Sequence, residues 1–127
     1  MDAVEQIRAE IPDFPGCDSE NECRLSDEQV RAYAGERLAL VDRKKLPAEV
    51  GDLYDQLLFR CEFTNQDAFR VFAEDRSGSR VAAVLDADAA MVAAAKQIDS
   101  NAEGIAEKLK ALSDAFDRRD AAMKQSA

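Results

Sequence analysis

The stretch DADAAMVAAAKQIDSNAEGIAEKLKALSDAFDRRDAAMK, residues 86–124, decides the fold, because apolar residues return every three or four positions and no proline interrupts them. One apolar seam runs through Val84, Met91, Ile98, Ile105 and Leu112. A second seam runs through Ala95, Ala102, Leu109, Phe116 and Met123. This alternating spacing is the heptad pattern of coiled-coil helices. It predicts a long amphipathic helix over residues 80–124.

Such a helix is too long to hide its seams in one small globule. An unbroken helix over residues 86–124 would extend about 60 Å, whereas a compact domain of this length has a radius of gyration of about 14 Å. We favour a continuous helix, whose exposed seam would pair with a second copy or with another helical protein. The alternative is a break at residues 100–104, where Ser100 and Glu103 form a capping-box pattern and Gly104 disfavours helix.

The continuous helix predicts a partner-binding surface in the second half of the seams, where the large apolar side chains gather. These residues are Ile98, Ile105, Leu109, Leu112 and Phe116. The first half offers little apolar area, because Asp88, Ala95 and Ala102 occupy one set of seam positions. Association through this surface would make the protein a coiled-coil homodimer or a subunit of a complex.

The residues before the long helix predict a cluster of short helices over residues 1–76. A short helix over 2–11 should end at Pro12, and Phe14, between two prolines, should anchor the following segment. The capping box Ser26-Asp-Glu-Gln opens a second helix, and Pro47 suits the first position of a third. The predicted fold is therefore all-α, a single domain over 1–127. The alternative is an α+β fold with a small hairpin at 69–85, around Gly78.

Composition restricts the partners and the compartment. The net charge is −9, and residues 1–30 hold nine acids but only two arginines. This field repels a phosphate backbone and suits a basic protein, so we expect no direct nucleic-acid binding. No apolar run is long enough for a membrane span, and residues 1–5 lack the pattern of a secretory signal. We therefore expect a cytoplasmic protein that does not enter a membrane.

The chemistry-bearing residues are few. The chain has no histidine, which removes the commonest general base and most zinc ligation. Three cysteines in a cytoplasmic chain predict free thiols, with Cys61 a small hydrophobic residue on its helix. A redox or metal-sensing pair of Cys17 and Cys23 is an alternative. We assign no catalytic residue, no cofactor and no metal ligand.

These observations predict a non-enzymatic interaction or regulatory protein. It would act through its long helix and its acidic N-terminal surface, and one form of it is an inhibitor that covers a basic partner. The alternatives are a structural subunit of a larger assembly, such as a phage, secretion or scaffold particle, and a redox or metal sensor that uses Cys17 and Cys23.

Overall fold

The structure, a computed structural model, describes residues 2–62, 79–101 and 103–124. In this part of the chain all regular structure is helical, so the predicted all-α class is confirmed. The helices are α1 (Ala3–Arg8), α2 (Glu20–Leu38), the short 3-10 helix η1 (Arg43–Lys45), α3 (Ala48–Glu62), α5 (Ser79–Lys96) and α6 (Ile105–Lys124). The hairpin alternative falls partly outside the described residues, and its last part, from Ser79 to Leu85, is helical.

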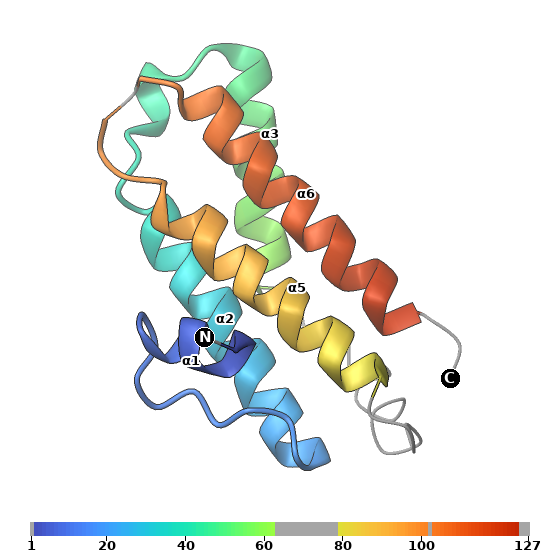
Figure 1. Cartoon of the computed structure of the whole chain (residues 1–127). Helices are drawn as coiled ribbons and strands as arrows, with labels where there is room; N and C mark the ends of the chain where they lie inside the picture. Colours follow the sequence, from blue (N-terminus) through green and yellow to red (C-terminus); the bar gives the residue numbers. More distant parts are fainter. Residues whose placement is uncertain (1, 63–78, 102, 125–127) are drawn as a thin grey trace.

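The single long helix that we favoured is wrong, because the chain breaks between Lys96 and Ile105 and forms an antiparallel pair, α5 and α6 (Figure 1). Gly104, at φ +69°, adopts a backbone conformation that favours glycine. The break lies at the alternative position, residues 100–104, but the connection is longer than a tight hairpin. The main-chain N–H of Asn101 donates to Asp99 Oδ1 at 2.9 Å, which helps to order the connection.

The end of α5 is held by a side chain from another helix. The Arg37 guanidinium on α2 donates to the carbonyl oxygens of Ala95, at 3.3 Å, and Lys96, at 3.0 Å. These carbonyls belong to the last turn of a helix, which has no intrahelical donors for them. An arginine from α2 therefore satisfies the end of α5 and joins the two helices.

The core lies between the α5–α6 pair and the N-terminal helices. Helix α2 packs on α5 and on α3, α3 also packs on α6, and α1 lies across α5. The buried apolar residues at the centre come from all of these helices, and they include Ile7, Leu38, Leu57, Met91 and Leu112. Within the part of the chain that the structure describes, no helix is both long and apolar enough to span a membrane.

Helix α2 begins earlier than the sequence predicted. We placed its start at Ser26, but it starts at Glu20, and the Ser19 side chain caps it by accepting from the Glu22 N–H at 3.2 Å. Two capping-box patterns stand seven residues apart, and the second lies inside the helix. Ser26 is buried there, and its hydroxyl donates to the Gly16 carbonyl.

Candidate functional site

The N-terminal acids lie on an exposed surface that is poor in compensating bases. Of the nine acids in residues 1–30, six are exposed in the structure: Asp2, Glu5, Asp13, Asp18, Glu20 and Glu28. Among the described residues, none of these six forms an ion pair within 4 Å. The two arginines of residues 1–30 form hydrogen bonds to other groups: Arg8 donates to the Phe14 carbonyl, and Arg24 donates to the Asn21 side chain. We call the exposed and partly exposed residues between Asp13 and Glu28 the acidic surface, which leaves out the buried Asp27.

An exposed leucine lies within the acidic surface. Leu25 on α2 keeps 47% of its side chain in contact with solvent. Residues three and four positions away on a helix share its face, and for Leu25 these include Asn21, Glu22 and Glu28. The acidic surface therefore combines an apolar contact point with carboxylates on both sides of it along the helix.

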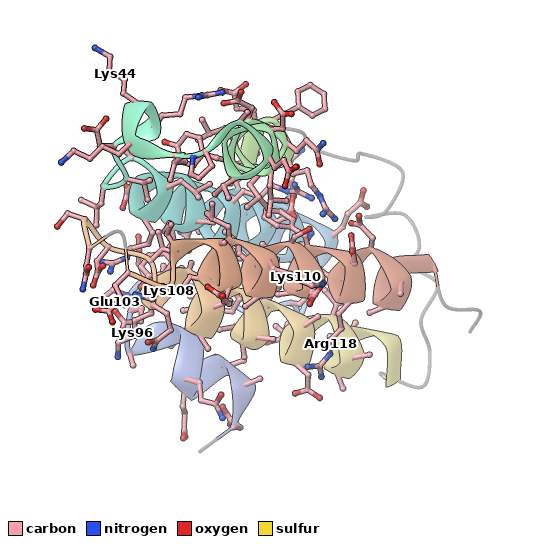
Figure 2. The ribbon with its side chains drawn as sticks, turned by 90° about the horizontal axis from the view of Figure 1, so that it is seen from above. Lys44, Lys96, Glu103, Lys108, Lys110 and Arg118 are labelled. Carbon is pink, nitrogen blue, oxygen red and sulfur yellow. A yellow bond between two sulfur atoms is a disulfide. The ribbon has the colours of Figure 1, made fainter. Side chains whose placement is uncertain are left out.

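The bases of the C-terminal helices lie elsewhere and mostly have acidic neighbours. Figure 2 shows Lys108, Lys110 and Arg118 along α6 and Lys44 projecting from η1. Lys108 pairs with Asp99 at 4.0 Å, and Lys110 pairs with Asp114 at 3.5 Å. The excess negative charge is thus concentrated around the beginning of α2.

The segment before α2 is fixed by three contacts. Phe14 is almost fully buried in the core, which confirms its predicted role as an anchor. Gly16, at φ +91°, turns the chain so that its carbonyl meets the Ser26 hydroxyl. Cys17 and Cys23 are joined by a disulfide, with their Cα atoms 4.4 Å apart. The prediction that these two are free thiols is wrong, because the turn at Gly16 brings both to the start of one helix.

A second charged group lies inside the molecule, where α2, α5 and α6 meet. We call Asp27, Arg31, Asp88 and Arg119 the buried charge cluster; each is at most 5% exposed. The Arg119 guanidinium contacts both carboxylates, with Nη2 on Asp27 and Nε on Asp88. Arg31 Nε donates to both oxygens of Asp27 at 3.0 Å. The cluster therefore contains two acids and two bases, all of them paired.

Burial raises the pKa of Asp88 to about 6, although the neighbouring Arg119 lowers it. Desolvation disfavours the charged carboxylate more than the guanidinium favours it. A carboxyl with this pKa could take part in proton transfer, but Asp88 is 2% exposed and no substrate can reach it in this conformation. The arrangement fits a structural link between helices better than a catalytic group.

The Phe116 ring lies next to the buried charge cluster and contacts one of its arginines. Arg31 and Arg60 both face the Phe116 ring, with Cζ atoms 5.6 and 4.7 Å from its centroid. Arg60 also pairs with Asp117 at 3.0 Å and with Asp120 at 3.1 Å. Stacking of guanidinium groups on an aromatic face is favourable. This contact holds α3 on α6.

Sequence reasoning missed the buried charge cluster, although a signal for it was present. Arg119 lies seven residues after Leu112 on one apolar seam, and Asp88 lies seven before Ala95 on the other. Two opposite charges at positions of the apolar seams indicate that the two side chains are buried together as an ion pair. Asp27 and Arg31 are also an opposite-charge pair one helical turn apart.

The five residues predicted to bind a partner all lie in the core of the chain itself. Ile98, Leu109 and Leu112 are fully buried, Phe116 is 1% exposed and Ile105 is 7% exposed. They face the interior because the α5–α6 turn lets one half of the seam cover the other. A partner could reach them only if this pair of helices opened, so binding through these residues stays a prediction.

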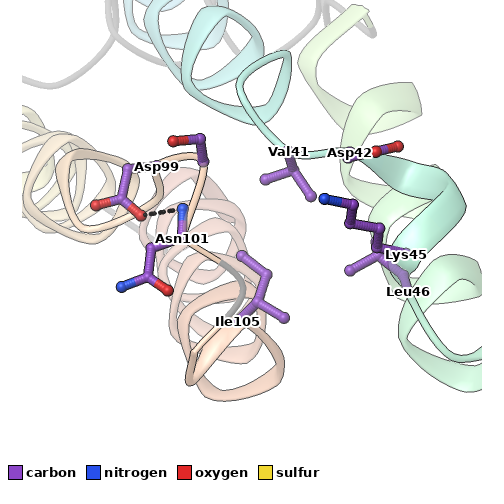
Figure 3. A pocket seen from close by; sticks show the side chains of 8 residues that line it. Val41, Asp42, Lys45, Leu46, Asp99, Asn101 and Ile105 are labelled. Atoms are coloured by element: carbon purple, nitrogen blue, oxygen red, sulfur yellow. Dashed lines mark hydrogen bonds between the residues drawn. The ribbon is translucent and has the colours of Figure 1, made fainter.

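A small hollow lies between the connection after α2 and the connection after α5 (Figure 3). It is lined by Val41, Lys45, Leu46, Asp99 and Ile105, among others, and its volume is about 20 Å³. A hollow of this size has room for water, whereas sites for metabolites measure about 300–1,000 Å³. In the described residues there is also no group of three or more Cys, Asp or Glu side chains arranged to hold a metal ion.

Comparison of the chain with protein-family models, with curated proteins and with solved structures found no match in any of the three. The function of this protein therefore has to be inferred from its own surface, above all from the acidic surface.

Proposed function

We propose that this protein is a non-enzymatic interaction protein whose acidic surface binds a basic partner protein. The observation that carries the proposal is the exposed Leu25 among carboxylates that form no ion pair within 4 Å in the described residues, since the nearby Arg24 donates to Asn21 instead. An interface needs an apolar anchor for affinity and complementary charge for steering and orientation. The acidic surface offers both.

The excess charge supports a partner rather than a purely solvating role. Acidic groups elsewhere in the described chain are often neutralised within it, as in the pair of Lys96 with Glu10 at 2.8 Å and the pair of Arg43 with Asp55 at 2.9 Å. Around the beginning of α2 the acids stay unpaired, and the local arginines contact a carbonyl and an amide instead. Mutual repulsion of unpaired acids is relieved when a basic surface approaches.

The occupant that fits is a helix or loop carrying lysine or arginine around one apolar side chain. The apolar side chain would cover Leu25, and the basic groups would reach Glu28 and the acids of residues 18–22. An inhibitor of a basic protein is one form of this function. It differs from the seam-mediated pairing expected from the sequence, since it leaves α5 and α6 closed.

The test is binding of an amphipathic lysine–leucine helical peptide, followed by fluorescence anisotropy at about 0.02 and about 0.2 M salt, between which the Debye length falls about threefold. We expect the variant Leu25→Ser/Glu28→Lys to lose about tenfold or more in affinity, since it removes the apolar contact and reverses one charge. Binding of the unaltered protein should weaken as the salt concentration rises.

The chain offers a matched control on the same helix and the loop that follows it. Leu40 is also 47% exposed, and Glu36 is exposed and without an ion pair within 4 Å among the described residues. The variant Leu40→Ser/Glu36→Lys therefore makes the same chemical change outside the acidic surface and should bind within about twofold of the unaltered protein, the effect of the added charge alone. Equal losses in the two variants, or binding indifferent to salt, would contradict the proposal.

A further inference from the structure

We propose that the Cys17–Cys23 disulfide is a reversible switch that sets the conformation of the acidic surface and thereby regulates partner binding. This inference rests on the function proposed above. The disulfide lies within that surface, two residues before Leu25, and encloses Asp18, Glu20 and Glu22 in its loop.

The bond lies where it controls how the chain enters α2. Ser19 caps the helix, so Cys17 lies two residues before the cap and Cys23 is the fourth residue of the helix. In many helices a hydrophobic contact between a residue just before the cap and the fourth helical residue fixes the entry angle. Here a covalent bond links the fourth helical residue to Cys17, one position before the residue that makes this contact in other helices. Breaking it would free residues 17–19 to change direction.

The surrounding contacts would confine such a change to the acidic surface. Phe14 is 1% exposed on the N-terminal side, and the Ser26 hydroxyl holds the Gly16 carbonyl. Neither contact involves a cysteine. Between these fixed points lie residues 17–25, which carry Asp18, Glu20, Glu22 and Leu25. Reduction should therefore loosen this stretch without unfolding the core.

The two sulfur atoms differ in access. Cys17 is partly exposed, whereas Cys23 is 3% exposed and packs with Val84. A thiolate of a dithiol reductant would attack Cys17 Sγ, forming a mixed disulfide, and Cys23 would leave as a thiolate and take up a proton. The helix dipole at the start of α2 favours that negative charge. The second thiol of the reductant, deprotonated, then displaces Cys17. The protein disulfide gains two electrons and two protons, and the dithiol becomes a disulfide.

The third cysteine does not compete in this exchange. Burial raises the pKa of Cys61 to about 11, so at neutral pH its sulfur stays protonated and is a poor nucleophile. It also packs beside Gly35 on α2. Gly35 is twelve residues from Cys23, which corresponds to about 18 Å along the helix. The exchange is therefore limited to Cys17 and Cys23.

The experiment compares the oxidised protein with the protein reduced by dithiothreitol. Hydrogen exchange measured by mass spectrometry should be about tenfold faster at the first turns of α2 after reduction, while α3 and α5 keep their protection. Affinity for the lysine–leucine peptide should fall about threefold or more, because the surface must then be ordered on binding. Reoxidation should restore both values.

Two variants separate the bond from other effects of the reductant. The protein with Cys17→Ser/Cys23→Ser should behave as the reduced form under all conditions, and Cys61→Ser should keep the full response. Equal exchange rates or equal peptide affinity in the two redox states would overturn the proposed regulation while leaving the acidic surface as a binding site. Absence of peptide binding in both states would refute the function itself, and the regulation with it.

Discussion

The acidic surface and the buried charge cluster use the same kinds of side chain in opposite ways. In the cluster, Asp27 and Asp88 are each held by Arg119, and the charges balance. On the surface, acids such as Glu20 and Glu28 have no basic partner among the described residues. A buried charge must be paired because it loses its hydration, whereas an exposed one keeps it. The paired acids of the buried charge cluster therefore serve the fold, whereas the unpaired acids of the acidic surface are available to a partner.

The largest effect should come from breaking the pairing in the cluster. Replacing Arg119 with methionine leaves the carboxylate of Asp88 buried without its guanidinium, and the free energy of unfolding should fall by about 3–5 kcal/mol. Urea denaturation measures this loss. Lys110→Met is the control on the same helix, since its pair with Asp114 is exposed and should contribute less than about 0.5 kcal/mol. A loss below about 1 kcal/mol for the Arg119 variant would mean that the cluster does not hold the helices together.

The second effect is a pH dependence opposite in sign to that of most paired carboxylates. The pKa of Asp88 is about 6 in the folded protein, above its ordinary value, so the folded state binds the proton more tightly than the unfolded state. Protonation then favours folding. Its contribution to stability is present below about pH 4 and is lost as the pH rises through about 6.

An Asp88→Asn variant isolates this contribution from the other titrating groups. The groups that face Asp88 are Arg119 from α6 and Asp27 and Arg31 from α2, and all three stay in the variant. The stability of the unaltered protein relative to the variant should rise by about 2–3 kcal/mol between pH 7 and pH 4, measured by urea denaturation. Parallel pH profiles for the two proteins would show that Asp88 has no raised pKa.

The smallest effect on stability should come from the acidic surface. The variant Leu25→Ser/Glu28→Lys changes exposed side chains, so its free energy of unfolding should stay within about 0.5 kcal/mol of the unaltered protein. Thermal and urea unfolding check this. A loss as large as that of the Arg119 variant would place Leu25 and Glu28 in the folding core and would weaken the comparison between the two regions.

Much of the fold could be predicted from local patterns. The apolar seams of residues 84–124 indicated helix, and the structure has helix on both sides of the turn. Pro47 lies directly before α3, and Phe14 is buried. Phe59 falls off the apolar stripe of α3, and it is 67% exposed. Such features depend on neighbours in the sequence, which the sequence itself displays.

The turn at Gly104 and the disulfide were harder to predict because each competes with another local pattern. The heptad spacing continues through Gly104 without interruption, so the sequence favoured the continuous helix over the break. Cys17 and Cys23 have five residues between them, in a segment that the second capping box assigned to a loop. Their contact depends on the helix starting at Glu20.

By itself, the sequence determined the all-α class, the apolar seams of the C-terminal part, and the concentration of negative charge near the N-terminus. Only the tertiary structure decided that the seams of α5 and α6 cover each other and that Asp88 meets Arg119. The physical reason is that apolar burial is non-directional: periodicity identifies a surface that must be covered, but not what covers it. The sequence likewise does not show which charged residues are buried. Asp27 lies in the interior, whereas Glu28, its neighbour in the chain, lies on the surface.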